Sequence, residues 1–236
     1  MTENQMDARI DYRREAIFGL VYFGLYFGYL FIYQEGEFLH WLTLVLLPFL
    51  LLYLYQKKRA PGTSVKESLA SVGIRRGNLK RGLWWAVLLG FALSSVQLLL
   101  SRHQQEIWQL LRSGKALWLF PLVFVMMLFL AGFTEEWFFR GILQTRLVKL
   151  LKSKVWGVVL TAFLFGIYHL PYAYLNPNWP SHGDWGAAFA SALGQGVPMG
   201  LILGAVYERT ENNLLACILI HALFNSLPAM TMIKFG

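Results

Sequence analysis

The sequence has few charged side chains and almost no cysteine. Only 14% of its 236 residues are Asp, Glu, Lys or Arg, whereas soluble domains carry about 25%. Hydrophobic residues make up 56% of the chain, and the mean hydropathy is +0.46. One soluble core cannot bury that much apolar surface, so the composition predicts a polytopic membrane protein. The single cysteine, Cys217, excludes an internal disulfide and is interpreted as a small packed helix residue.

No cleavable signal peptide is expected. The opening MTENQMDARIDYRRE is long and mixed in charge, and the aromatic run after it has no small-residue cleavage site, so that run is interpreted as a retained first span. The expected fold is all-α, a single transmembrane domain (1–236) of about seven helices. Seven segments approach the roughly 20 apolar residues that a spanning helix needs: 16–33, 38–55, 82–100, 117–134 with a helical continuation, 155–171, 186–207 and 214–233.

Acidic residues are too few to balance the basic ones, and the formal net charge is +8. In a soluble protein this excess would suggest nucleic acid, but here the basic residues sort by side of the membrane. This bias predicts an integral membrane protein with its N-terminus in the cytoplasm and its C-terminus outside, and it requires no nucleic-acid partner. The compact size favours a bacterial plasma membrane. The inner segments hold 17 Lys and Arg residues and the outer segments 4: three before the first span, eight from Lys57 to Arg81, five from Arg140 to Lys154, and Arg209, against Arg102, Arg112, Lys115 and Lys234.

The basic 57–81 loop has two open interpretations. It could contact anionic lipid head groups, or it could serve only to orient the chain. Pro48 lies inside the second span, where a kink is expected. Small residues recur at every fourth position of the sixth span, which lets a neighbouring helix approach closely, either as plain packing or as a tight wall around a site. These residues are Ala192, Gly196, Gly200 and Gly204.

Ionisable residues are nearly absent from the spans. The first, third and sixth have none between their ends, and the second has only His40, interpreted as interfacial at its outer edge. A charge inside the bilayer costs about 2.5–3.5 kcal/mol on insertion scales, so those present are rare and usually functional. The rest lie on three spans and are suited to proton transfer or metal binding: Glu135, Glu136, Arg140, His169 and His221.

Spacing relates these residues to one another. Glu136 and Arg140 are four apart with Glu first, the favourable order for an ion pair on one helix face. Glu135 is about 100° round the helix from Glu136 and is expected to face elsewhere. The midpoint of positions 135 and 169 is 152, inside the basic turn 151–154. An unbroken helical hairpin would therefore place Glu135 and His169 at the same depth, about 25 Å from that turn.

The last two histidines of the spans have partners at helical spacing. His221 and Asn225 are four apart on the seventh span and share a face. Phe165 and His169 repeat the spacing on the fifth span, where the aromatic ring could fix the imidazole. Pro171 is expected to end that helix soon after His169.

Carboxylate, imidazoles and a carboxamide are the parts of a hydrolytic site. A Glu can act as general base on water, and an imidazole can share that water or protonate a leaving amine. A His or Asn can donate to a developing oxyanion, a contribution worth about 3–4 kcal/mol. No serine nucleophile elbow is present, and Cys217 has no base on its own helix face. Nucleophilic catalysis is therefore the weaker hypothesis.

Three motifs, EEWFFR, FGIYH and HALFN, occur in this order over residues 135–225. Together they resemble the CPBP intramembrane proteases, also called the Abi family, which include the type II CAAX prenyl endopeptidases. The resemblance implies an endopeptidase that cuts a membrane-associated substrate, either a lipidated CAAX-type protein or a small hydrophobic peptide precursor. It places the catalytic core in residues 116–236, after N-terminal spans in 1–115. It also implies that Glu136 and Arg140 support the reacting residues.

The resemblance implies roles for the other four residues. Glu135 would activate water with the help of His169, while His221 and Asn225 would form the oxyanion site. Family members are commonly labelled metalloproteases, and His169, His221 and Glu135 would make a plausible set of zinc ligands. A metal-free mechanism is favoured here, because the HExxH spacing is absent and Asn225 suits an oxyanion donor better than a zinc ligand.

Two other functions stay open. A non-proteolytic immunity protein or scaffold could use the same fold for binding. A proton-coupled transporter could use the same Glu and His residues as a relay, although paired half-repeats and broken helices in matching positions are absent from the sequence.

Overall fold

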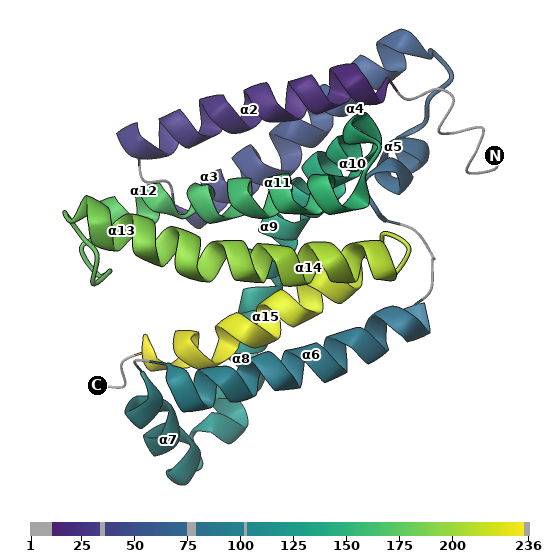
Figure 1. Cartoon of the computed structure of the whole chain (residues 1–236). Coiled ribbons are helices and arrows are strands. Elements are labelled where there is room, and N and C mark those ends of the chain that lie inside the picture. The colour runs from purple at the N-terminus through teal and green to yellow at the C-terminus, as the bar shows by residue number, and fades with distance from the viewer. Residues whose placement is uncertain (1–10, 34–35, 75–78, 102, 234–236) are drawn as a thin grey trace.

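The computed structural model describes residues 11–33, 36–74, 79–101 and 103–233, and this part of the chain contains helices and turns but no strand (Figure 1). The all-α prediction is confirmed, and each predicted span corresponds to a helix long and apolar enough to cross a membrane. These helices are Tyr12–Ile32, Phe38–Arg59, Lys80–Leu99, Ala116–Leu151, Lys154–Leu175, Trp185–Arg209 and Leu214–Thr231.

The first span, α2 (Tyr12–Ile32), begins at Asp11, whose side chain accepts a hydrogen bond from the Arg14 amide. The second span begins with α3 (Glu37–Trp41) and a π-helical turn, η1 (Leu42–Leu46). It continues as α4 (Leu47–Arg59), with Pro48 in the first turn. The helix runs on through Pro48, with the π-helical turn directly before the proline.

A short helix, α5 (Val65–Ser71), follows the second span. Its first turn is a capping box, in which the Ser64 hydroxyl accepts from the Glu67 amide and the Glu67 carboxylate accepts from the Ser64 amide. The third span is α6 (Leu79–Leu100), and α7 (Gln104–Arg112) connects it to the fourth.

The fourth span is a single helix of 36 residues, called here the composite helix. It stays unbroken past Gly141, as the predicted hairpin requires. It ends where Lys152 adopts a left-handed conformation with φ 51°. Its five consecutive segments are α8 (Ala116–Met127), η2 (Leu128–Phe133), α9 (Thr134–Glu136), η3 (Trp137–Gln144) and α10 (Thr145–Leu151).

The fifth span begins at Ser153, whose hydroxyl accepts from the Trp156 amide and caps α11 (Lys154–Tyr168). The chain turns at His169 and then resumes as α12 (Leu170–Leu175). The prediction that Pro171 ends the helix is therefore wrong. Pro171 lies in the first turn of α12, a position where its missing N–H has no helical partner to lose.

The sixth span consists of α13 (Trp185–Ser191), η4 (Ala192–Gly196) and α14 (Val197–Arg209). Its small residues pack against α11, confirming the close approach. A Cβ added at Gly196 would lie 2.7 Å from the Gly166 Cα, and one added at Gly200 would lie 2.8 Å from the Ala162 Cα.

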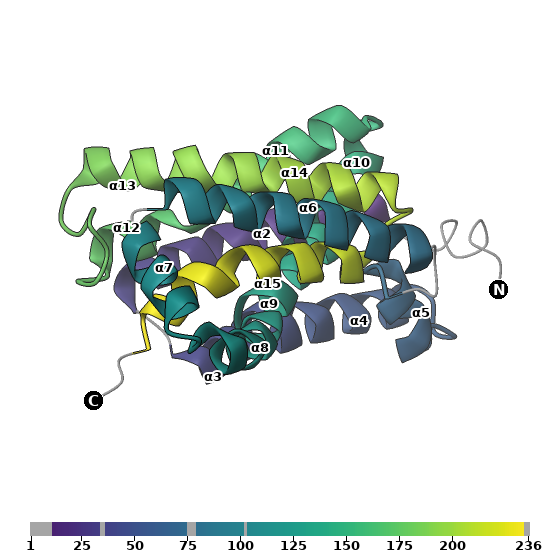
Figure 2. The same ribbon diagram turned by 90° about the horizontal axis from the view of Figure 1, so that it is seen from below.

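The last span, α15 (Leu214–Thr231), lies inside the bundle, where it packs against α6, α8, η2 and α14. Figures 1 and 2 both show α15 beside α6. More than half of its most apolar window, 56%, is buried, whereas only 17% of the α6 window is buried. Residues on α15 are therefore enclosed by other helices, while α6 presents much of its surface outward.

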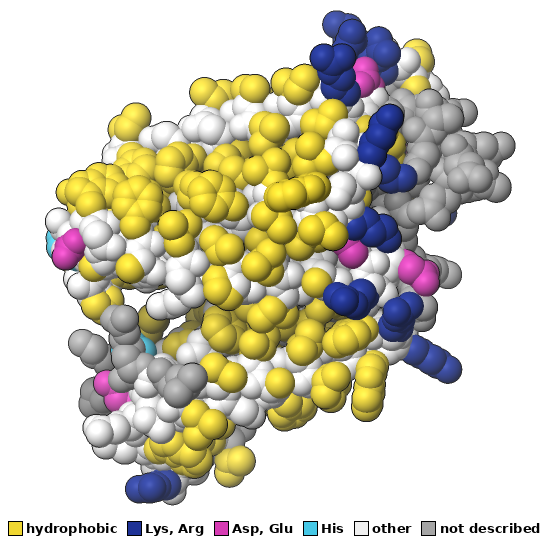
Figure 3. Space-filling view, viewed as in Figure 1, with side chains coloured by type: hydrophobic (Ala, Val, Ile, Leu, Met, Phe, Trp, Pro, Cys, Tyr) yellow, Lys and Arg dark blue, Asp and Glu magenta, His cyan; other side chains and the backbone are white. Residues whose placement is uncertain are grey.

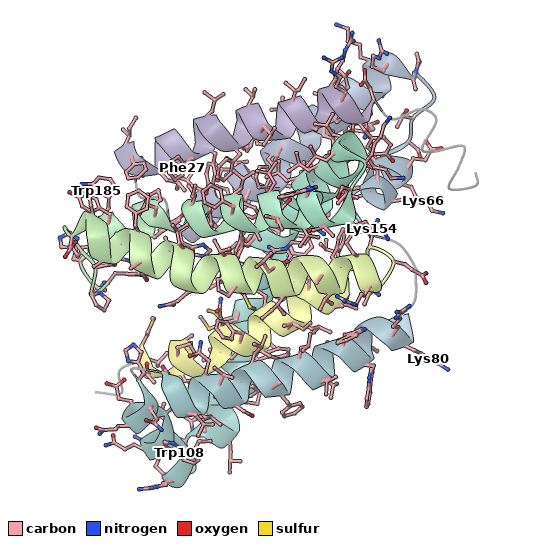
Figure 4. The ribbon with its side chains drawn as sticks, in the orientation of Figure 1. Phe27, Lys66, Lys80, Trp108, Lys154 and Trp185 are labelled. Carbon is pink, nitrogen blue, oxygen red and sulfur yellow. The ribbon has the colours of Figure 1, made fainter. Side chains whose placement is uncertain are left out.

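Basic side chains gather at one end of the molecule (Figure 3). Lys66, Lys80 and Lys154 lie at this end, and Trp185 lies at the other (Figure 4). The predicted inner segments thus share one end, as the expected orientation requires. Which side of the membrane this end faces stays a prediction. Three basic residues of the predicted inner segments, Arg9, Arg75 and Arg76, lie outside the described residues, as do Arg102 and Lys234 of the predicted outer segments.

Candidate active site

Three side chains from three spans meet at Glu135 in α9. The Glu135 Oε2 lies 3.7 Å from the Nε2 of His169, at the junction of α11 and α12, and 3.8 Å from the Nε2 of His221 on α15. The structure therefore brings Glu135 and His169 level across the hairpin, as the midpoint of their positions predicts. Two imidazole nitrogens face the same carboxylate oxygen.

The His169 ring is fixed by its own helix. Its Nδ1 lies 2.8 Å from the Phe165 carbonyl oxygen, and because a carbonyl only accepts, Nδ1 carries the proton and donates. The Phe165 ring also packs edge-on against the imidazole, with the ring centroids 4.9 Å apart. The predicted contact between these residues is confirmed. In a neutral ring, the Nε2 that faces Glu135 is then an acceptor.

Glu136 binds two groups at one oxygen. Its Oε1 accepts from the Arg140 Nη1 at 3.0 Å and from the His221 Nδ1 at 2.8 Å. The side chains of Glu136 and Arg140 are fully buried. The predicted ion pair is confirmed, but the contact with His221 joins two spans and has no spacing signal in the sequence. Glu136 thereby fixes the His221 ring with its Nε2 towards Glu135.

The small-residue stripe of the sixth span gives Arg140 a second anchor. Its Nη2 donates to the Gly200 carbonyl oxygen at 3.2 Å, and its guanidinium lies 4.5 Å from the centre of the Phe165 ring. One turn further on, the Gln144 Nε2 donates to the Gly204 carbonyl oxygen at 3.0 Å. The stripe therefore lines the supporting part of the site as well as packing on α11.

The side chains of Glu135 and His169 are partly accessible, whereas the Glu135 Oε2 atom itself is buried. The side chain of Glu135 is 11% exposed and that of His169 is 24% exposed. The Glu135 Oε2 has no hydrogen-bond partner within the described residues. The distances of 3.7 and 3.8 Å to the imidazoles exceed a direct hydrogen bond, and polar groups at such separations are commonly bridged by water.

Among the described residues, Asn225 makes no hydrogen bond to Glu135, His169 or His221. It lies on α15 one turn after His221 and is half-buried. Its amide makes no hydrogen bond within the part of the chain that the structure describes. The geometry puts it on the same helix face as His221 and leaves its amide available.

The suggested zinc ligands do not form a metal site in this structure. A tetrahedral zinc with bonds of about 2.05 Å would hold its donor atoms about 3.3 Å apart, whereas Glu135 lies 3.7 and 3.8 Å from the two imidazoles. Among the described residues, no group of three or more His, Cys, Asp or Glu side chains is placed to hold a metal ion.

Two sets of buried side chains surround the site. His40, at the outer edge of the predicted second span, is 92% buried, with its Nδ1 3.3 Å from the Tyr26 hydroxyl. The Tyr26 ring stacks on Tyr168, the residue before His169. Trp137, Phe138 and Phe139 are also buried. Aromatic packing thus encloses the site on this side, which single-span patterns could not indicate.

Comparison with known proteins agrees with these motifs. Residues 117–227 match the family model for type II CAAX prenyl endopeptidase Rce1-like proteins. The matched segment contains Glu135, His169, His221 and Asn225 together with the Glu136–Arg140 pair. No curated protein and no solved structure matches the chain. Through this segment, which covers just under half of the chain, the protein is similar to the Rce1-like type II CAAX prenyl endopeptidases, and its seven apolar helices make it an integral membrane protein.

Proposed function

We propose that the protein is an intramembrane endopeptidase that hydrolyses a peptide bond of a membrane-associated substrate with water activated by Glu135. One observation carries this proposal: a carboxylate oxygen without a partner among the described residues faces two imidazole nitrogens within 3.8 Å. The family supports the reaction class. The substrate is either a lipidated CAAX-type protein or a small hydrophobic peptide precursor.

The hydrogen bond from His169 to Phe165 sets the first step. With Nδ1 donating, a neutral His169 presents a lone pair to Glu135, so two acceptors face each other. A water between them donates one O–H to each and keeps its own lone pair for the substrate carbonyl carbon. As the C–O bond forms, Glu135 takes the water proton. It then passes that proton to the amine nitrogen as the C–N bond breaks.

His221 and Asn225 act on the carbonyl oxygen. The His221 Nδ1 proton is held by Glu136, so Nε2 can donate only when the ring is doubly protonated. In that imidazolium, Nδ1–H stays on the Glu136 carboxylate while Nε2–H stabilises the developing oxyanion. The Asn225 amide, one turn along α15, supplies a second donor. Arg140 pairs with Glu136 at 3.0 Å and holds its carboxylate in place.

The surface offers a route towards these residues. Figure 3 shows the molecule hollowed between the layer of α13 and α14 and the helices α7 and α15 below it. His221 and Asn225 lie on α15. An extended hydrophobic peptide entering from this side would meet donors on α15 before it reached Glu135.

The test uses purified protein in lipid nanodiscs and two peptides of one sequence, with and without a prenyl group. Wild-type protein is expected to give new N- and C-termini by mass spectrometry, and the Glu135→Ala/His169→Ala variant is expected to give none. Cleavage of the prenylated peptide alone would identify a CAAX-type substrate. Equal cleavage of both would favour a peptide precursor.

Two results would overturn the proposal. One is cleavage that survives the double substitution unchanged. The other is a cellular phenotype of the intact protein that persists when Glu135 and His169 are both replaced, which would indicate a non-proteolytic immunity or scaffold role. Proton-driven uptake by proteoliposomes, without any cleavage, would indicate a transporter.

A further inference from the structure

A second buried charge pair lies beyond the site, near the end of the composite helix. The Arg146 Nε of α10 lies 3.0 Å from the Glu15 Oε2 of α2, and the two side chains are 0% and 1% exposed. In the sequence analysis, Arg146 is one of the basic residues that orient the chain in the membrane, and Glu15 lies just before the predicted first span. The structure instead buries both charges in a contact between the first and fourth spans.

Arg146 also binds backbone on two sides. Its Nη1 donates to the Ser71 and Gly141 carbonyl oxygens, both at 2.8 Å, and its Nη2 donates to the Ser71 hydroxyl at 2.9 Å. Ser71 ends α5, whereas Gly141 lies inside the π-helix η3. The guanidinium thus links α2, α5 and the π-helical part of the composite helix.

The Gly141 carbonyl that Arg146 binds lies near the junction between the π-helix η3 and the α-helix α10. Where a π-helix returns to an α-helix, the hydrogen-bond register moves from five residues back to four, so one carbonyl at the junction lacks a backbone donor. Arg146 reaches five residues back to Gly141, and the Thr145 hydroxyl reaches five residues back to the Arg140 oxygen at 3.0 Å. Two consecutive side chains therefore stabilise the π-helical register.

The end of α5 packs directly on this junction. A Cβ added at Gly141 would lie 2.7 Å from the Val72 carbonyl oxygen, and Val72 is fully buried. Gly73 adopts φ +90° beside the Tyr207 hydroxyl, which lies 3.1 Å from the Thr145 hydroxyl. We call residues 71–73 the α5 turn. It belongs to the connection between the second and third spans and lies outside the matched segment 117–227.

The remaining polar groups of this region hold the α5 turn in place. The Gln56 Nε2 of α4 donates to the Glu15 Oε1 at 3.1 Å, and its Oε1 accepts from the Ser68 hydroxyl at 2.7 Å. Within the described residues, no buried side-chain nitrogen or oxygen atom of this network lacks a hydrogen-bond partner. The network consists of Glu15, Gln56, Ser68 and Arg146. This satisfied network differs from the site, where polar atoms of Glu135, Glu136 and Arg140 lack partners.

We propose that Arg146 and the α5 turn are positioning elements of the active site. They hold the π-helical register of residues 137–144, which sets where Arg140 lies relative to Glu136 and thus how Glu136 orients His221. The consequence for catalytic rate rests on the proposed function, whereas the consequence for helix register does not.

The first test is the double variant Glu15→Gln/Arg146→Gln. It removes both charges, so neither is left buried and unpaired, but it also removes the donors to Gly141 and Ser71. Glu106→Gln is the matched control, because it removes one charge of an exposed pair with His103 far from the composite helix junction. Amide hydrogen exchange is expected to accelerate in residues 137–146 of the double variant and to stay unchanged in the other spans and in the control.

The second readout is steady-state cleavage of the peptide that wild-type protein cuts. The double variant is expected to lower kcat about tenfold or more, because small misplacements in a site have large effects on rate, while KM stays nearly unchanged. A network that only stabilises the fold would leave kcat per folded molecule at the wild-type value. That result, or wild-type exchange in residues 137–146, overturns the proposal. If wild-type protein cuts no peptide, the proposed function fails and hydrogen exchange alone decides the positioning.

A variant without charge changes guards against a folding defect. Gly141→Ala would push its Cβ against the Val72 carbonyl, whereas Gly28→Ala on α2 meets nothing within 4 Å. Gly141→Ala is expected to reproduce the faster local exchange and the lower kcat, and Gly28→Ala is expected to change neither. Wild-type behaviour of a folded Gly141→Ala protein would contradict the role of the α5 turn.

Discussion

The two glutamates of one sequence doublet act in different surroundings. Glu135 is partly accessible and faces two imidazoles, whereas Glu136 is fully buried and holds Arg140 and His221 at one oxygen. An acceptor shared by a guanidinium and an imidazole fixes both donors at once. At the scale of single residues, Glu135 is suited to moving a proton and Glu136 to keeping His221 in orientation.

Neutralising Glu136 separates these roles. Glu136→Gln would leave Arg140 charged and buried without a counter-ion, which costs about 3–5 kcal/mol, so a large fall in thermal stability is expected. The double variant Glu136→Gln/Arg140→Gln removes both charges and is expected to regain much of that stability without regaining activity. Thermal unfolding in detergent and peptide cleavage measure the two effects. Restored activity in the double variant would contradict the assigned role of Glu136.

Metal dependence can also be tested at this scale. Among the described residues, no three possible ligands are placed to hold a metal ion. In the proposed mechanism, Asn225 and the His221 that is bound to Glu136 donate hydrogen bonds to the oxyanion. Peptide cleavage is therefore expected to survive prolonged dialysis against 1,10-phenanthroline. Activity that is lost on dialysis and returns with added zinc would show that His169, His221 and Glu135 rearrange around a metal.

At the scale of elements, π-helical turns lie on both sides of the Glu doublet. η2 precedes α9 and η3 follows it, and such turns are frequent at functional sites. The hairpin could be predicted, because counting residues from the turn at Lys152 needs only an unbroken helix. The π-helical register could not, because it depends on Arg146 and Thr145 bonding to carbonyls under contact with the α5 turn. An apolar run has no periodic signal for such a shift.

The close contact between α14 and α11 can be tested with two glycines of the sixth span. A Cβ at Gly200 would lie 2.8 Å from the Ala162 Cα, whereas one at Gly194 meets nothing within 4 Å. Gly200→Ala is expected to destabilise the protein by about 1–3 kcal/mol through overpacking. It should also lower activity, because the Gly200 carbonyl holds Arg140.

Gly194→Ala is the control and is expected to leave the melting temperature unchanged or slightly raised. Thermal unfolding and cleavage of the two variants side by side measure the difference. Equal melting temperatures of Gly200→Ala and Gly194→Ala would mean that α14 and α11 can move apart without loss of stability. That result would contradict the close packing of these two helices.

At the scale of the whole molecule, the basic residues lie at one end and an apolar band covers much of the remaining surface (Figure 3). Composition and run length were enough to predict seven spans, since each is a local property of the chain. Contacts between distant spans were not predictable from one sequence. Glu15 with Arg146, His221 with Glu136, and His40 with Tyr26 each join helices whose relative rotation no local pattern encodes.

The orientation of the basic end can be measured with single cysteines. Lys66→Cys lies at the basic end, and His182→Cys lies in the exposed turn before α13. A membrane-impermeant maleimide added to intact cells is expected to label His182→Cys, and to label Lys66→Cys only after lysis. Wild-type protein is the control, because Cys217 is fully buried. The reverse labelling pattern would overturn the cytoplasmic placement of the N-terminus.

The central claim is that Glu135 activates the attacking water. Its most direct test is the single-turnover cleavage rate of Glu135→Gln, which keeps the shape of the side chain but cannot take a proton. The control is Glu106→Gln, which changes only an exposed pair with His103. With both proteins shown to be folded, a loss of about 10²–10⁴-fold is expected for Glu135→Gln and none for Glu106→Gln. Cleavage by Glu135→Gln at the wild-type rate would contradict the account.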